Sequence, residues 1–258
     1  MESFKVGRTQ CEIVDMREFA ALCEKWLITN SFHHVVTLNP EMVVMAEGDK
    51  TFLKALQAAD IRVPDGSGII WAHWYVRSQF WSLFWSLVAF SFRSVERVTG
   101  VETMVMLSDL ASRGGQSIYL LGGTTSQAAK TAAYLKKRYP NLEISVSAPH
   151  TATLGGPPEI LLDIQAKKPD ILLVAYGAPI QTVWIEEMRG RLPSVKIAVG
   201  VGGAFAIISE ERPRAPRVLR KYNLEWLWRL ILEPRRIRRI WRATVEFPRL
   251  VQRQKQQK

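Results

Sequence analysis

The chain has 258 residues and is 47% hydrophobic, so it can bury a sizeable core as one large domain or as one domain with an appendage. Its two cysteines, Cys11 and Cys23, are too few for a disulfide scaffold or a cysteine-based zinc site, and a reducing cytosol is the simplest compartment. The first residues, M-E-S-F-K-V-G-R, contain no apolar stretch, and we therefore expect no signal peptide.

The net charge of +11 is concentrated at one end of the chain. Residues 212–258 contain 15 Lys and Arg against 3 Glu, a net charge of +12, whereas the first 211 residues contain 20 basic and 21 acidic residues. A neutral body with a basic, Trp-rich end favours anionic lipid or diphosphate as a partner over nucleic acid. We expect residues 1–209 to form the core and residues 210–258 a basic, membrane-associating appendage.

Residues 1–30 predict a small hairpin and a helix, to which we assign no chemistry. A β-branched run over residues 34–38 predicts a strand that stops at Asn39. Pro40 suits the first turn of a helix that reaches Ala59, and Asn39 is a plausible N-cap for it.

A second short strand, over residues 61–63, ends in the turn P-D-G-S-G at residues 64–68. The glycines of this turn permit positive φ or a close backbone approach. Ligands of open α/β sheets bind at the carboxyl ends of the strands, so Thr37, Asn39 and Asp65 are expected to converge at one rim. Asp65 alone could also be an Asx turn that only caps the next helix.

The segment of residues 78–92 is rich in aromatic residues but has only 15 residues, whereas a bilayer span needs about 20. It could be a buried helix, an interfacial helix that dips into the headgroup region, or a lid over a lipid-linked substrate. Phe80, Trp81, Phe84 and Trp85 support the interfacial interpretation.

Beyond Gly100, helical and strand patterns alternate, which predicts an α/β fold with a doubly wound, mainly parallel sheet. The predicted strands cover residues 117–121, 142–146, 171–174 and 196–199. The helices between them are predicted over residues 104–113, 126–138, 160–166 and 184–189.

Three of these strand ends carry glycine. Gly122 and Gly123 precede a helix whose amides could hold a phosphate or ribose hydroxyl, although an ordinary turn has the same pattern. The other two ends carry Gly177, Pro179 and Gln181, and Gly200, Gly202 and Gly203. None of these segments is G-x-G-x-x-G with an acid about 20 residues later, so a nicotinamide site is disfavoured and we expect no cofactor.

Several motifs together resemble the WecG/TagA/CpsF glycosyltransferases (glycosyltransferase family 26), over roughly residues 30–240. They are T-L-N-P-E at 37–41, P-D-G-S-G at 64–68, E-R-V-T-G at 96–100, G-x-P-x-Q at 177–181, G-V-G-G-x-F at 200–205 and R-A-P at 214–216. The resemblance implies a Rossmann-like core and a UDP-N-acetylmannosamine-type donor. It also implies a polyprenyl-diphosphate-linked sugar as acceptor, in bacterial surface-polymer assembly.

The resemblance assigns roles to individual residues. Asp65 is implied to be the catalytic base, with Thr37 and Asn39 beside it. Gln181 could bind uracil or ribose, or be a polar residue of a first helical turn. The implied substrate-binding set is Arg97, Gly122, Gly123, Gly177, Pro179, Gln181, Gly200, Gly202, Gly203, Arg214, Arg217 and Arg220. The last three could bind diphosphate through their guanidinium groups, or form a solvated face.

The chain also departs from the family pattern. Thr182 and Ala206 stand where the family has acidic residues, and T-G-S-D-L becomes T-G-V-E-T at residues 99–103. The loss of polar groups could alter the donor or weaken activity, and we favour an altered but active enzyme. The alternatives are an inactive, membrane-associated scaffold and a basic-tailed nucleic-acid-binding protein.

The expected reaction is an inverting transfer in which Asp65 takes the proton of the acceptor hydroxyl. The sequence contains no D-x-D and no clustered histidines, so we expect a metal-independent reaction in which helix N-termini and Arg214 offset the charge of the leaving UDP.

The C-terminal part predicts a basic amphipathic helix with Ile237, Ile240, Trp241 and Val245 on one face. An RNA-binding tail would not need this apolar stripe. We therefore expect a peripheral protein on the inner face of the plasma membrane, and a homo-oligomer is compatible with the sequence.

Overall fold

The computed structural model describes residues 2–79, 82–91, 98–147, 157–211, 213, 215–216, 218–219, 222, 225–234 and 237–257. A six-stranded sheet in the order β4-β3-β8-β7-β5-β6 forms its centre, and every neighbouring pair is parallel. The strands are β3 (His33–Leu38), β4 (Ile61–Pro64), β5 (Ser117–Gly122), β6 (Glu143–Val146), β7 (Ile171–Ala175) and β8 (Ile197–Gly200). The predicted α/β class and parallel sheet are confirmed.

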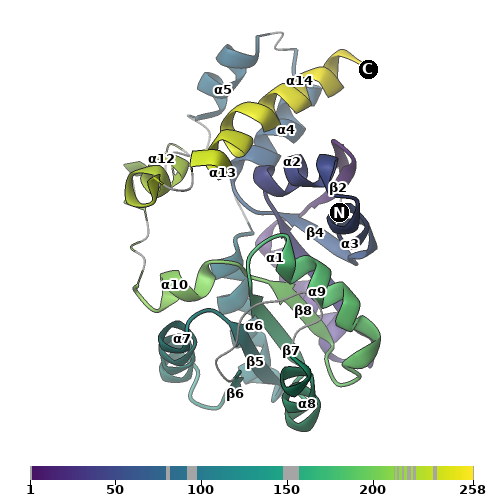
Figure 1. The fold of residues 1–258 in the computed structure, drawn as a ribbon, viewed down its shortest axis with the longest axis vertical. Helices are drawn as coiled ribbons and strands as arrows, with labels where there is room; N and C mark the ends of the chain where they lie inside the picture. Colours follow the sequence, from purple (N-terminus) through teal and green to yellow (C-terminus); the bar gives the residue numbers. More distant parts are fainter. Residues whose placement is uncertain are drawn as a thin grey trace.

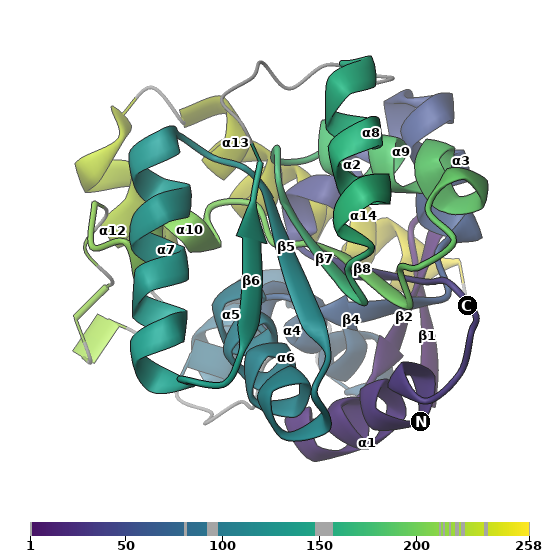
Figure 2. The ribbon, with the colours of Figure 1, turned by 90° about the horizontal axis from the view of Figure 1, so that it is seen from below.

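Helices cover both faces of the sheet, which explains why its central strands are apolar on both sides (Figures 1 and 2). On one face, Val35, Leu120 and Val199 pack with α1 (Met16–Leu27), α6 (Gly100–Gly114), α7 (Thr125–Arg138) and α10 (Ala204–Ile208). The other face carries α2 (Pro40–Gly48), α3 (Lys50–Ala58), α8 (Pro158–Lys167) and α9 (Ile180–Met188), over residues such as Leu38 and Leu172.

The helix predicted from Pro40 to Ala59 is two helices, so that prediction was wrong at its middle. The backbone of Asp49 is extended, with φ −114° and ψ 102°, and it separates α2 from α3. Its carboxylate accepts a hydrogen bond from the Phe52 amide at 2.9 Å and caps α3. Gly48 followed by a good N-cap residue makes a new helix start more favourable than continuation.

The predicted N-terminal hairpin is present as β1 (Glu2–Val6) and β2 (Thr9–Ile13). It lies against the edge strand β4, where Cys11 Sγ donates to the Arg62 carbonyl at 3.1 Å. Glu12 accepts from the Arg62 backbone amide at 2.8 Å and from its guanidinium at 2.7 Å. The hairpin therefore covers one edge of the sheet.

The C-terminal helices return to the body of the protein. They are α12 (Glu225–Leu232), α13 (Ile237–Trp241), a π-helical turn (Arg242–Glu246) and α14 (Phe247–Gln256). Helix α14 packs on α2 and α4 (Ser67–Arg77) and buries Phe247 and Val251, while the Gln254 amide donates to the Lys5 carbonyl at 2.7 Å. The end of the chain therefore shares a core with residues 1–209. The division at residue 210 stays a prediction.

Of the helices in the described parts of the chain, none has both the length and the apolar character needed to cross a bilayer. Helix α5 (Leu83–Ser91) lies within the aromatic segment and is partly exposed. Phe84 and Trp85 are exposed, so this helix is not buried within the chain, whereas Phe80 and Trp81 of the same segment lie outside the described residues.

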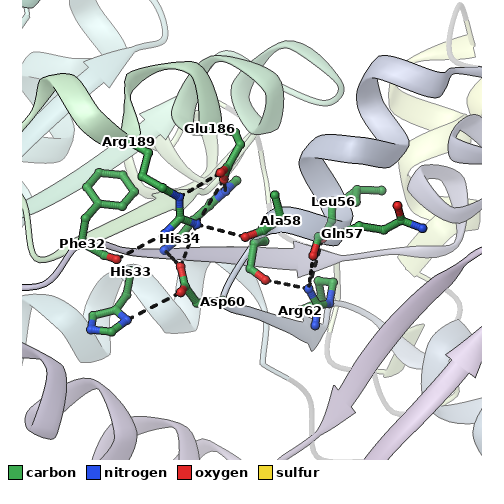
Figure 3. A network of polar contacts seen from close by, with 11 residues as sticks. Phe32, His33, His34, Leu56, Gln57, Ala58, Asp60, Arg62, Glu186 and Arg189 are labelled. Atoms are coloured by element: carbon green, nitrogen blue, oxygen red, sulfur yellow. Dashed lines mark hydrogen bonds and ion pairs between the residues drawn. The ribbon is translucent and has the colours of Figure 1, made fainter.

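A polar network anchors the amino end of β3, away from Thr37 (Figure 3). His34 is fully buried, and its Nδ1 lies 2.9 Å from Glu186 Oε2. Arg189 donates to Glu186 at 2.8 Å and to Asp60 at 2.8 Å, and Asp60 also accepts from the His34 backbone amide at 2.7 Å. Burial lowers the pKa of His34, so the imidazole is neutral and donates to Glu186.

Candidate active site

A cavity of about 350 Å³ lies at the carboxyl ends of β3, β4, β5, β7 and β8. Its lining combines the predicted polar side chains with glycine loops and with residues of the C-terminal helices. The side chains and loops at the strand ends are Thr37, Asn39, Asp65, Thr99, Gly100, Gly123, Gln127, Tyr176, Gly177, Gln181, Gly202 and Gly203. The described C-terminal residues that line it are Pro213, Ala215, Trp228, Leu232, Glu233 and Arg239.

The register of β3 and β4 explains why Asn39 and Asp65 meet. Leu38 is paired with Pro64, so the next residue of each strand leaves the sheet at the same level. The Asp65 amide donates to the Leu38 carbonyl at 2.8 Å and fixes this exit. The structure therefore brings the predicted catalytic side chains together at one rim.

Thr37 and Asn39 form hydrogen bonds to the backbone. Thr37 is 6% exposed, and its hydroxyl donates to the Gly200 carbonyl at 3.1 Å. The Asn39 side-chain oxygen accepts from the Met42 amide at 3.1 Å, which confirms the predicted N-cap. Both groups are held by local structure, so they present fixed polar atoms to the cavity.

Glycine is required in the turn after Asp65. Gly66 has φ +88°, a left-handed conformation that other residues rarely adopt. A Cβ on Gly68 would lie 2.5 Å from Cγ of Pro40, so only glycine lets this turn approach the start of α2. The P-D-G-S-G turn thus places Asp65 beside the T-L-N-P-E segment.

Gln181 connects two of the glycine loops. It is 5% exposed, and its Oε1 accepts from the amides of Gly177 at 2.9 Å and Gly202 at 3.1 Å. A Cβ on Gly200 would lie 2.5 Å from Gln181 Nε2. The side-chain oxygen of Gln181 is therefore engaged with the backbone, and the proposed contact of Gln181 with uracil or ribose stays a prediction.

The predicted substrate-binding residues of the glycine loops differ in whether they line the cavity. Gly123, Gly177, Gly202 and Gly203 line the cavity, whereas Gly122, Pro179 and Gly200 do not. Gly122 instead packs beneath an aromatic ring, since a Cβ there would lie 2.7 Å from Tyr176. These positions support the walls of the cavity.

The residues that depart from the family pattern differ in whether they line the cavity. Thr182 is 1% exposed and does not line the cavity, whereas Ala206 and Ile207 do. In T-G-V-E-T, Glu102 forms a capping box with Thr99, whose hydroxyl donates to the carboxylate at 2.9 Å. That carboxylate orders the start of α6, and the helix start itself lines the cavity.

Charges of both signs surround the cavity, since Asp65, Glu233 and Arg239 line it and Arg239 is paired with Glu41. The starts of α2, α4, α6 and α7 lie at the strand ends that line it, and helix N-termini carry partial positive charge. Burial raises the pKa of Tyr176, a lining residue whose ring packs edge-on against Trp184, so its phenol is protonated at neutral pH. Within the described ranges, no three His, Cys, Asp or Glu side chains are grouped to hold a metal ion.

Four predicted substrate-binding arginines, Arg97, Arg214, Arg217 and Arg220, lie outside the described residues. A different arginine lines the cavity. Arg239 Nε donates to both carboxylate oxygens of Glu41, at 2.8 and 2.9 Å, and Glu41 is 13% exposed.

The sequence predicted a basic amphipathic helix around Ile237, and the position of Arg239 in the cavity was missed. No local signal could have found this contact, because an acidic residue in the first turn of a helix is already stabilised by the helix dipole and needs no basic partner.

A parallel sheet with helices on both faces and a cavity at its strand ends defines a Rossmann-like α/β protein with a candidate ligand site at the carboxyl rim. The model of the glycosyl transferase WecG/TagA/CpsF family matches residues 4–258. The chain therefore belongs to this family, over more of its length than the motifs alone indicated.

Two similar proteins illustrate the relationship. Both are N-acetylglucosaminyldiphosphoundecaprenol N-acetyl-beta-D-mannosaminyltransferases of Staphylococcus aureus. The protein of strain MRSA252 is 29% identical over 207 residues, which cover 80% of this chain and 74% of the relative. The protein of strain NCTC 8325 / PS 47 is 28% identical over the same extent.

Proposed function

We propose that this protein transfers an N-acetylmannosamine-type residue from a UDP donor to a polyprenyl-diphosphate-linked N-acetylglucosamine. The reaction inverts the anomeric carbon and needs no metal ion. The observation that carries the proposal is the convergence of Asp65, Thr37 and Asn39 with four glycine-loop residues in one cavity of a chain of this family. The reaction after which the relatives are named supplies the sugar and the acceptor.

In the proposed step, the acceptor hydroxyl oxygen attacks the anomeric carbon of the donor. Its proton passes to the Asp65 carboxylate, and the bond from the anomeric carbon to the diphosphate oxygen breaks with its electron pair on UDP. Asp65 is suited to this role because it directly follows β4 at the cavity, on a turn that glycine keeps close to α2.

The leaving UDP develops negative charge, which positive groups must offset. The sequence lacks the D-x-D with which many transferases hold a metal. The helix N-termini at the rim and the guanidinium of Arg239 supply positive potential instead. Glu41 holds Nε of that guanidinium and so orients it.

The appendage provides the proposed route to the lipid-linked acceptor. Trp228 and Leu232 of α12 line the cavity. Ile231 is 62% exposed, Ile237 60% and Trp241 50%. Exposed apolar side chains next to a basic helix are typical of a membrane-surface contact, and we place it on the inner face of the plasma membrane.

The test is release of UDP from UDP-N-acetylmannosamine, with a short-chain prenyl-diphosphate-N-acetylglucosamine acceptor and EDTA present. Acceptor-dependent turnover that survives EDTA supports the proposal, and an inverted anomeric linkage in the product supports the single displacement. A protein that releases no UDP from this or related UDP sugars, yet binds vesicles, would be a membrane-associated scaffold instead.

A further inference from the structure

Helix α5 presents an apolar face that the body of the protein does not cover. Phe84 is 65% exposed, Trp85 62% and Leu87 38%, and the rings of Phe84 and Trp85 are in edge contact at 5.3 Å. The opposite side is anchored, because Phe90 is 5% exposed and its ring lies 5.8 Å from that of Trp74 in α4. The exposed side chains therefore belong to a helix whose opposite side is packed against α4.

The helix is too short to cross a bilayer. Nine residues extend about 13 Å, against a hydrocarbon core of roughly 30 Å. It can only lie in the interface, the depth at which Trp and Phe are most favourable.

The charges around α5 suit an anionic surface. The sequence contains no Asp or Glu between Asp65 and Glu96. Lys255, near the end of α14, donates to the carbonyl of Ser78, the first residue of the aromatic segment, at 2.7 Å. Arg249 and Arg253 of the same helix are exposed. Figure 1 shows α5 in the same half of the molecule as α12, α13 and α14.

A second copy of the chain is a weaker candidate for covering this face. Even fully buried, Phe84 and Trp85 would supply about 150–250 Å² each, and Leu87 less. A stable dimer buries about 800 Å² on each partner. Three side chains are therefore too small an interface, whereas insertion of a few aromatic residues is enough to orient a protein on lipid.

We propose that Phe84, Trp85 and Leu87 form a second membrane contact, separate from the C-terminal helices, which inserts into the headgroup region of an anionic bilayer. The inference rests on the proposed function, because a lipid-linked acceptor requires a protein that works at a membrane. Two contacts on different elements fix the orientation of a protein on a surface. The cavity, between the sheet and α12, is thereby held at a constant height above the lipid.

The first experiment compares binding of the full-length chain to phosphatidylcholine vesicles with and without phosphatidylglycerol. The variant Phe84→Ser/Trp85→Ser is expected to bind the anionic vesicles at least about tenfold more weakly than wild type. The matched control is Ile28→Ser/Leu162→Ser, which removes two apolar side chains that are 83% and 63% exposed elsewhere. It should bind as wild type does.

The second experiment places an environment-sensitive fluorophore at position 84. Both native cysteines are buried, so Phe84→Cys can be labelled selectively, with Ile28→Cys as the control. A blue shift and quenching by lipid-borne quenchers at position 84 alone support insertion. The inference is overturned if the double serine variant binds vesicles as wild type does and the probe at position 84 stays in water. It is also overturned if wild type self-associates in solution and the double serine variant does not.

Transfer to a short-chain, water-soluble acceptor separates this inference from the proposed function. Both serine variants should keep wild-type turnover in that assay, because neither pair lines the cavity. If wild type shows no transfer but the probe inserts, the proposed function fails and the membrane contact stands. If transfer occurs and the probe stays in water, only the membrane contact fails.

Discussion

At the scale of single residues, two side chains of the cavity lining differ in their proposed roles: Asp65 is proposed to take a proton, and Gln181 to hold the walls. Asp65 follows β4 and lines the cavity from a glycine turn. Gln181 lies deeper, and its oxygen ties the loop after β7 to the loop after β8. Substitutions at these two positions should therefore have different consequences.

Asp65→Asn should lower the transfer rate by roughly 10²–10⁴-fold, because an amide of the same size cannot accept the hydroxyl proton. Thermal unfolding should be nearly unchanged. Steady-state UDP release measures the first effect, and Asp109→Asn, on the exposed surface of α6, is the control. Wild-type turnover by Asp65→Asn would show that another group is the base.

Gln181→Ala and Gly200→Ala should each raise the donor KM roughly tenfold, because in both variants the Gly177 and Gly202 amides lose their hydrogen bonds to the Gln181 side chain. The alanine Cβ at position 200 would displace the carboxamide, which is only 2.5 Å away. On a Gln181→Ala background this clash is absent, so the double variant should be no worse than Gln181→Ala. Additive effects in this cycle would contradict the shared mechanism.

At the scale of elements, the junction between α2 and α13 joins the sheet rim to the C-terminal part of the chain. The Glu41 carboxylate accepts twice from Arg239 Nε, across 198 positions of sequence. Arg239 is 42% exposed, so the ion pair should contribute under about 1 kcal/mol to stability. Its proposed contribution is the orientation of a guanidinium in the cavity.

Glu41→Gln and Arg239→Gln should each lower kcat/KM about tenfold while thermal stability changes little, because the guanidinium is released or removed. The control is Arg249→Gln on α14, where the arginine is exposed and does not line the cavity. Measurement of kcat/KM for both substrates at low salt tests this. An Arg239→Gln enzyme with wild-type kcat/KM would remove Arg239 from the proposed mechanism.

At the scale of the whole molecule, the network at the amino end of β3 couples stability to pH. Burial alone would raise the pKa of Glu186, but hydrogen bonds from His34 and Arg189 outweigh it and lower the pKa to about 2, from 4.5. This stabilisation is complete above pH 4.5 and is lost as the pH falls toward 2. The lowered pKa of His34 acts in the same direction, since below pH 6.5 the unfolded chain binds a proton that the folded chain does not.

Glu186→Gln should therefore destabilise the protein at neutral pH by roughly 1–2 kcal/mol, because the carboxylate is partly exposed and its partner His34 is neutral, and the difference from wild type should shrink as the pH falls below 4.5. Urea unfolding over a series of pH values measures this. The control Glu24→Gln changes an exposed carboxylate on α1 and should follow the wild-type curve. A Glu186→Gln difference that stays constant down to pH 3 would rule out the titration of Glu186 as the cause.

Much of the architecture could be predicted from the sequence because its signals are local. Apolar strands alternating with helices specify a parallel sheet, and Asn39 followed by Pro40 specifies a helix start, since both depend on neighbouring residues. The rule that strand ends meet at one rim then brought Thr37, Asn39 and Asp65 together. The break at Asp49 was also a local signal, but it was overlooked within a continuous apolar pattern.

Only the tertiary structure decided the remaining features of the site. The bond of Gln181 to Gly202, the pairing of Arg239 with Glu41 and the packing of α14 on α2 and α4 join residues far apart in the chain. Periodicity shows that a helix has an apolar face but not which surface covers it. The sequence therefore determined the sheet and its rim, whereas packing determined which C-terminal residues enter the cavity and which apolar side chains remain exposed.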